Sequence, residues 1–197
     1  MGTRSLTVFI DEHSKKEIVV MYRQYDGYIE YHGKRLCDYL QSFDEVVNGI
    51  GANDYVRKTA NGMSCLTAQA IMHFKSKIEN RDYNTKVFNP ETGFMESAVM
   101  KGNHTGGIYL YPAGTRDYGE EYIYVVKKLK KGITLEAYKA GCKEWTTRDG
   151  KTMPAIPDEV IHKGLVSDNW FEQALKAEKI IHDRKEAEWR ATQEAKQ

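Results

Sequence analysis

Alternating apolar and polar positions predict two strands at the start of the chain. Leu6, Val8 and Ile10 share one side of an extended segment over residues 3–10, and this period of two marks a half-buried strand. Residues 17–24 are rich in β-branched side chains, which also favour a strand. Because only the polar residues 11–16 separate the two segments, we predict an antiparallel hairpin.

A helical period replaces this alternation in the next part of the chain and predicts two helices. Leu36, Leu40 and Phe43 lie on one face of a helix over residues 32–43. A second helix, over residues 62–78, follows Asn61, a residue type suited to capping a first turn. The apolar stripe of the second helix consists of Leu66, Ala70, Ile71, Phe74 and Ile78.

Three more strands are predicted further along, over residues 106–112, 121–128 and 132–140. Residues 79–105, which precede them, show neither period, so we predict a long irregular loop of a kind that is often functional. A small hairpin around residues 90–93 is the alternative, because Pro and Gly favour a turn there.

The chain ends in a predicted helix that begins near Asp168 and continues to residue 197. Its first half has an apolar face, whereas the residues after His182 are nearly all charged, so the first half is expected to pack and the second to project. Trp170 and Phe171 point about 100° apart on a helix. We infer that they contact two different surfaces, which favours a homo-oligomer. The apolar face consists of Trp170, Ala174, Ala177 and Ile181.

These elements together predict an α+β fold. We expect an antiparallel sheet of about five strands, in the chain order β-β-α-α-β-β-β, with two helices on one face and a long C-terminal helix. The predicted boundaries are residues 1–145 for the α+β core, 146–167 for a connecting segment and 168–197 for the charged helix. The predicted core residues are Leu6, Val8, Val20, Leu36, Leu40, Leu66, Ile71, Phe74 and Leu110.

Composition narrows the possible functions. The 197 residues carry a formal net charge of +1, which argues against dedicated nucleic-acid binding. The three cysteines include no CxxC pair and the six histidines are scattered, so we expect no disulfide framework, metal site or cofactor. No signal sequence or membrane-length apolar run is visible, and we expect a cytoplasmic protein without a membrane partner.

The richest cluster of chemical groups lies between the second predicted strand and the first predicted helix. A helix N-terminus beside Arg and Lys can receive a phosphate or a carboxylate, and a tyrosine can stack on a base. An ordinary strand end with surface charges is the alternative. Because a hairpin places the start of one strand beside the end of the next, Arg4 is expected near Arg23, Gln24 and Asp26. The candidate ligand-binding residues are Arg4, Tyr22, Arg23, Gln24, Tyr25, Asp26, His32, Lys34 and Asn61.

Catalytic motifs are absent from the sequence. There is no GxxxxGK[ST] phosphate loop and no HExxH, and Gly49-Ile50-Gly51 lacks the rest of a dinucleotide fingerprint. Cys65 lies near a helix start, where a thiol pKa can be lowered. His73 is about two helical turns away, too far to act as its base, so we predict that Cys65 is not a nucleophile.

Six stretches of the chain form a recognisable set: GTRSLT (2–7), MYRQYDGY (21–28), HGKRL (32–36), NGI (48–50), ANGMSCL (60–66) and GGIYLYP (106–112). Together they resemble a small uncharacterised family of tailed-phage and bacterial proteins. The chain departs from that family at Ile29-Glu30-Tyr31, where members look more like Pro-Ser-Gly, and the resemblance does not extend beyond about Trp145. It implies a phage or mobile-element context and the cytoplasm of a bacterium, and it implies no activity.

Three functions are compatible with these patterns. The leading hypothesis is binding of a small anionic ligand, a nucleotide or a nucleotide-derived signal, by a phage protein that sequesters a host defence signal. The second is a hydrolase or transferase that acts on such a ligand. The third is a module that binds a host or virion protein through the tyrosine-rich sheet and the final helix.

Overall fold

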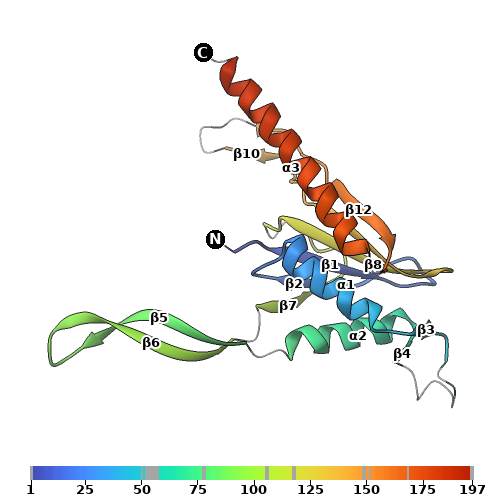
Figure 1. The fold of residues 1–197 in the computed structure, drawn as a ribbon, viewed down its shortest axis with the longest axis horizontal. Helices are drawn as coiled ribbons and strands as arrows, with labels where there is room; N and C mark the ends of the chain where they lie inside the picture. The colour runs from blue at the N-terminus through green and yellow to red at the C-terminus, as the bar shows by residue number, and fades with distance from the viewer. Residues whose placement is uncertain are drawn as a thin grey trace.

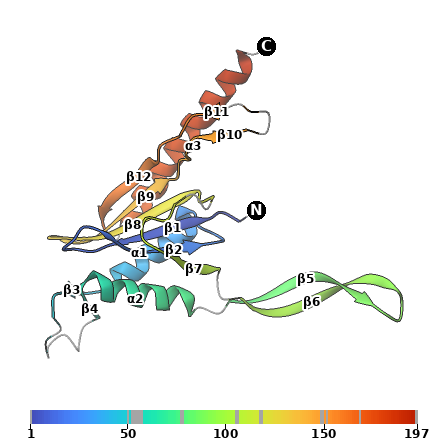
Figure 2. The same ribbon diagram turned by 180° about the vertical axis from the view of Figure 1, so that it is seen from behind.

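The computed structural model describes residues 2–49, 51, 58–76, 79–104, 107–116, 119–147, 150, 152–167 and 169–195. A twisted sheet lies at the centre of the molecule, with helices packed on one of its faces (Figure 1). A long hairpin extends from the base of this body, and the C-terminal helix projects from it in another direction (Figure 2). Among the described residues, no helix is both long enough and apolar enough to cross a membrane.

The central sheet has six strands in the order β12-β9-β8-β1-β2-β7. All neighbours are antiparallel except β1 and β8, which run parallel with Ser5 opposite Tyr122. Their bounds are β1 Ser5–Ile10, β2 Glu17–Arg23, β7 Ile108–Tyr111, β8 Tyr122–Leu129, β9 Gly132–Lys139 and β12 Glu159–Leu165.

The predicted α+β class is confirmed, but the expectation of five antiparallel strands is only roughly met. Strand β8 follows the edge strand β7 in the sequence, but it pairs with β1 on the far side of β2 and runs parallel to β1. The sixth strand, β12, forms inside the segment 146–167 that was predicted to be a connection. That segment also contributes to the small pair β10 (Trp145–Thr146) and β11 (Thr152–Met153).

Helices cover one face of the sheet and bury the larger core. A π-helical turn, η1 (Ile29–Gly33), leads directly into α1 (Lys34–Gln41), and α2 (Gly62–Lys75) follows a short parallel strand pair. That pair, β3 (Glu45–Val47) with β4 (Thr59–Asn61), was not predicted. A smaller core lies on the opposite face of the sheet and consists of Leu6, Val8, Val20, Tyr22 and Ile123.

Asn61 occupies the N-cap position of α2 but makes no side-chain capping bond. Its Oδ1 instead accepts a hydrogen bond from the backbone N of Gly49, at 2.7 Å. The first turn of α2 is satisfied from a distant part of the chain, because Met63 N donates to Glu12 Oε2 at 3.0 Å. A carboxylate is favourable there, since a helix N-terminus carries partial positive charge.

The nine predicted core residues agree with the structure except at two positions. Leu110 is 52% exposed, because β7 is an edge strand, and Ile108 on the same strand is buried instead. Ile71 is only partly buried at the margin of the larger core. The other seven are buried: Leu6, Val8, Val20, Leu36, Leu40, Leu66 and Phe74.

Residues 79–104 form a long hairpin, so the prediction of an irregular loop is wrong and the hairpin alternative is correct at the turn. Strands β5 (Glu79–Asn89) and β6 (Phe94–His104) pair along their whole length. The turn between them has Gly93 at a φ of +72°, a conformation that favours glycine. We call this hairpin the arm, and both views show it pointing away from the body (Figures 1 and 2).

The last helix, α3 (Trp170–Glu194), packs by its first half and is exposed from residue 182 onward. Asn169 occupies its N-cap position, and the predicted cap Asp168 lies outside the described residues. Trp170 and Phe171, the two aromatic residues at the start of α3, both contact other parts of the same chain. Trp170 donates from Nε1 to Leu135 O at 2.8 Å, and Lys34 Nζ lies 5.5 Å from the Phe171 ring centroid. The two-surface argument for a homo-oligomer therefore fails, and oligomerisation needs other support.

Candidate functional site

The predicted cluster is brought together along the backbone but divided between the two faces of the sheet. Ser5 pairs with Arg23, and Gly27 N donates to Thr3 O at 2.9 Å, so Arg4 lies beside the end of β2 as expected. Successive residues of a strand point to opposite faces. Tyr22 accordingly belongs to the smaller core, whereas Arg23 lies beneath η1 on the helical side.

On the outer face, Tyr22 lies among aromatic groups that the sequence analysis did not place there. Its ring centroid is 5.6 Å from that of Tyr111 and 6.0 Å from that of Tyr109, and its hydroxyl donates to Gln24 Oε1 at 2.6 Å. Burial raises the pKa of Tyr22, and the nearby positive charge of Arg4 opposes this. Arg4 Nε is buried and has no hydrogen-bond partner in the described part of the chain.

On the helical face, Arg23 and His32 are buried and hold η1 against the sheet. Arg23 Nε donates to Tyr25 O at 2.6 Å, and its guanidinium lies 5.2 Å from the Tyr31 ring centroid. His32 is fully buried, and its Nε2 lies 2.8 Å from Thr7 Oγ1. Burial lowers the pKa of His32 well below its usual value, and Arg23 adds to this effect. The imidazole is therefore neutral, and it fastens η1 to β1.

Of the remaining predicted site residues, Lys34 and Asn61 lie apart from both groups, whereas Tyr25 and Asp26 follow Arg23 in the chain. Lys34 pairs with Asp38 on the exposed side of α1, at 2.7 Å, and Asn61 contacts the Gly49 backbone. Tyr25 is 42% exposed in the turn after β2, and Asp26 beside it has a φ of +55°. The nine residues thus do not surround one cavity.

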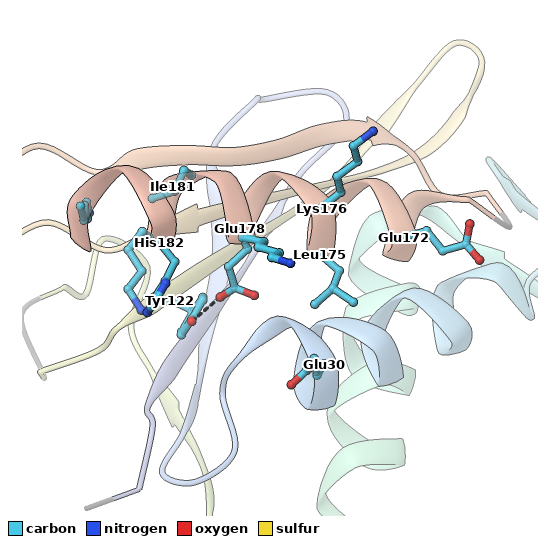
Figure 3. Close-up of a pocket in the computed structure, with 11 residues that line it drawn as sticks. Glu30, Tyr122, Glu172, Leu175, Lys176, Glu178, Ile181 and His182 are labelled. Atoms are coloured by element: carbon cyan, nitrogen blue, oxygen red, sulfur yellow. Dashed lines mark hydrogen bonds between the residues drawn. The ribbon is translucent and has the colours of Figure 1, made fainter. Parts of the chain in front are cut away.

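A cleft of about 720 Å³ lies between α3, η1 and the adjoining ends of β8 and β9 (Figure 3). We call it the α3 cleft. Leu175, Glu178 and His182 project into it from one side of α3, and Glu30 faces them from η1. None of its lining residues was predicted as a site, because four separate elements contribute them and no motif joins them. The other lining residues are Tyr122, Lys139, Glu172, Lys176, Lys179, Ile181 and Lys185.

Tyr122 and Lys139 form the floor of the α3 cleft. The Tyr122 hydroxyl donates to Glu178 Oε1, and Lys139 Nζ lies 3.9 Å from the Tyr122 ring centroid. Burial raises the pKa of Tyr122, and the bond to Glu178 raises it further. Burial lowers the pKa of Lys139; Glu121 and Glu178 counteract this, and Lys185 reinforces it. A half-buried ammonium thus lies on an aromatic face.

The charges of the α3 cleft are only partly paired. Lys185 forms an ion pair with Glu159 at 2.9 Å, and Glu178 receives the Tyr122 hydroxyl. In the described part of the chain, neither Lys139 nor Lys179 takes part in an ion pair. Lys176, which also lines the cleft, likewise forms no ion pair with a described residue, so the cleft offers three such ammonium groups beside the apolar side chains of Leu175 and Ile181. Two lining acids, Glu30 and Glu172, are also outside any ion pair between described residues.

The described residues give little support for a metal site or for a cysteine nucleophile. They contain no group of three or more His, Cys, Asp or Glu residues arranged to hold a metal ion. Cys65 is partly buried and accepts a hydrogen bond from Gln69 Nε2 at 3.2 Å, and the prediction that it is no nucleophile stays a prediction.

Comparison of the chain with protein-family models, curated proteins and solved structures finds no match.

Proposed function

We propose that this protein binds a small anionic ligand with a flat or apolar part in the α3 cleft. The observation that carries the proposal is the half-buried ammonium of Lys139, which has no ion-pair partner in the described part of the chain and lies on the Tyr122 ring beside Leu175. Ligand sites are mostly apolar concavities of roughly 300–1,000 Å³ with a few polar groups that fix orientation. The α3 cleft has this size and this character.

An anion is the ligand charge that Lys139 favours. Removing an ammonium from water is unfavourable unless an opposite charge accompanies it. Glu121 and Glu178 favour the charged form of Lys139, but neither forms an ion pair with it in the described part of the chain. A bound phosphate or carboxylate would supply the missing partner for Lys139, and Lys179 from α3 would add a second contact.

A nucleotide or nucleotide-derived signal would suit both the lysines of the cleft and its aromatic and apolar side chains. Its phosphate would meet the lysines, while its base would pack against Tyr122 and Leu175. The resemblance to phage proteins leads us to place this binding in a bacterial cytoplasm, where the protein would sequester a host defence signal. The cluster around Arg4 and Tyr22 is the second candidate site for the same ligand class. Arg4 Nε is buried without a hydrogen-bond partner among the described residues, and its charge acts on Tyr22, whose ring contacts Tyr109 and Tyr111.

The test is incubation of the purified protein with a bacterial nucleotide extract, followed by washing, release of bound molecules by heat and mass analysis. Recovery of an unaltered nucleotide supports the proposal. Recovery of an altered one would support the hydrolase or transferase alternative. If nothing is recovered, the binding proposal is wrong and the protein-interaction alternative remains.

A further inference from the structure

The arm lacks the support that two-stranded hairpins usually need. Its two strands of 11 residues pair with each other and extend away from the body (Figures 1 and 2). A lone two-stranded hairpin is only marginally stable in water, so an arm of this length gains from contact with another surface. Its tip carries three large apolar side chains in the open: Phe88, Phe94 and Met95 are 58%, 74% and 56% exposed.

The tip also carries negative charge in a fixed arrangement. Glu96 accepts hydrogen bonds from Asn89 Nδ2 at 3.0 Å and from Thr92 Oγ1 at 2.8 Å, and Gly93 N donates to Asn89 O at 2.8 Å. The bonds from Asn89 and Thr92 lower the pKa of Glu96, so its carboxylate is charged at neutral pH. With the exposed Glu91, the tip presents two acids beside its three apolar side chains.

A surface of the opposite charge lies at the turn between β8 and β9. Leu129 and Leu165 are 53% and 40% exposed there, beside a cleft of about 580 Å³. Lys130, Lys131 and Lys163 also line this cleft. We call these five residues the β8–β9 patch. The acid beside them, Glu136, is already paired with Lys127 at 2.8 Å, so the patch is apolar and basic.

We propose that the arm tip of one copy of this chain docks on the β8–β9 patch of a second copy. Apolar side chains flanked by acids on the tip match apolar side chains flanked by lysines on the patch. The arm and the β8–β9 turn lie at opposite ends of the body in both views, so one chain cannot make this contact with itself (Figures 1 and 2). A contact between two different surfaces joins copies head to tail, into a ring or an open filament.

The head-to-tail geometry allows a mixing experiment with two variants of the full chain. In Phe94→Asp with Met95→Asp, the tip is changed and the patch is intact. In Lys130→Glu with Lys131→Glu, the patch is changed and the tip is intact. All four residues are exposed, so both variants are expected to fold. The control Lys15→Glu with Lys16→Glu reverses two exposed charges in the neighbouring β1–β2 turn, outside the patch.

Light scattering over a range of concentrations should show particles that grow with concentration for the natural chain and for the control. Each variant alone should stay monomeric, with association weakened about tenfold or more. Their mixture should form one-to-one pairs that grow no further, because one intact tip meets one intact patch. The proposal is overturned if the natural chain stays monomeric, as it would if the arm binds a different protein. It is equally overturned if either variant assembles alone or if the mixture forms no pairs.

Discussion

Lys139 is the residue on which the proposed ligand site depends most directly. Replacing its ammonium in Lys139→Gln removes a charged contact to the ligand, and hydrogen bonds to charged groups are worth about 1.5–3 kcal/mol. We therefore expect about tenfold or greater loss of affinity for the nucleotide recovered from the extract, measured by titration calorimetry. Lys163→Gln is the matched control, because Lys163 Nζ lies over the Tyr138 ring at 4.9 Å but outside the α3 cleft. An equal loss of nucleotide affinity in both variants would show that Lys139 does not contact the ligand.

His32 should make the stability of the protein depend on pH. The folded chain holds the pKa of His32 well below its ordinary value of 6.5, so below that pH the unfolded chain binds a proton that the folded chain does not. Stability should therefore fall as the pH decreases below 6.5, by up to about 1.4 kcal/mol per pH unit from this group. Burial also lowers the pKa of His162, which adds to the slope.

The variant His32→Gln should lose the part of this slope that belongs to His32 while keeping the part from His162. Urea denaturation between about pH 7 and pH 5, where histidines titrate, measures the difference. The variant is expected to be less stable at pH 7, because the bond to Thr7 is altered, so the comparison concerns the slope and not the absolute stability. An unchanged slope would show that another group takes up the proton.

Residue spacing explains why the predicted cluster lies at one end of the sheet but is divided between its two faces. The hairpin pattern predicts Arg4 and Arg23 at the same end of the sheet, and the pairing of Ser5 with Arg23 confirms it. The period of two that identified the strands also implies that Tyr22 and Arg23 face opposite sides. Residues that are neighbours along the strand therefore cannot line one cavity. The α3 cleft is formed by four elements that are distant in sequence, and no local pattern predicts their contacts.

At the scale of elements, the arm shows where pattern reading has no signal. Strands are recognised by alternation only when one face is buried, and the described side chains of the arm lie outside both core clusters. For the same reason, replacing residues 79–104 with a short Gly-Ser linker should change the unfolding free energy by less than about 1 kcal/mol, close to the cost of changing a loop length. A cooperative urea transition with a much lower midpoint would show that the arm supports the core.

The helix α3 should stabilise the protein mainly through its first half, because its second half contributes only the partly exposed ion pairs of Arg184 and Lys185 with Glu159. Trp170 is buried and bonds to the β9 backbone, so Trp170→Ala should cost about 3–5 kcal/mol. Trp189 on the same helix is 63% exposed, and Trp189→Ala should change stability by less than about 0.5 kcal/mol. Denaturant titration of both variants measures the change in unfolding free energy for the same substitution at a buried and at an exposed position. Similar losses for the two would mean that the second half of α3 also packs.

Two features of the sheet could not be read from local sequence. The parallel pairing of β1 with β8 depends on how the chain returns across the sheet, which no periodicity encodes. Strand β12 contains Lys163 and Gly164 and alternates poorly, and it forms because the edge of β9 that does not pair with β8 is open to it. Class and core were predictable because they follow from burial, whereas topology follows from long-range pairing.

At the scale of the whole molecule, ligand binding and self-assembly use different surfaces and should be separable. The α3 cleft and the β8–β9 patch share no lining residue, and the arm tip belongs to neither. The variant Phe94→Asp with Met95→Asp should therefore release as much nucleotide per chain as the natural protein, while remaining monomeric. Conversely, Lys139→Gln should lose the ligand and still assemble. Heat release with mass analysis and light scattering on the same preparations provide both readouts. If loss of assembly also abolished ligand release, the ligand site would have to be completed by a second copy, and the α3 cleft of one chain would not suffice.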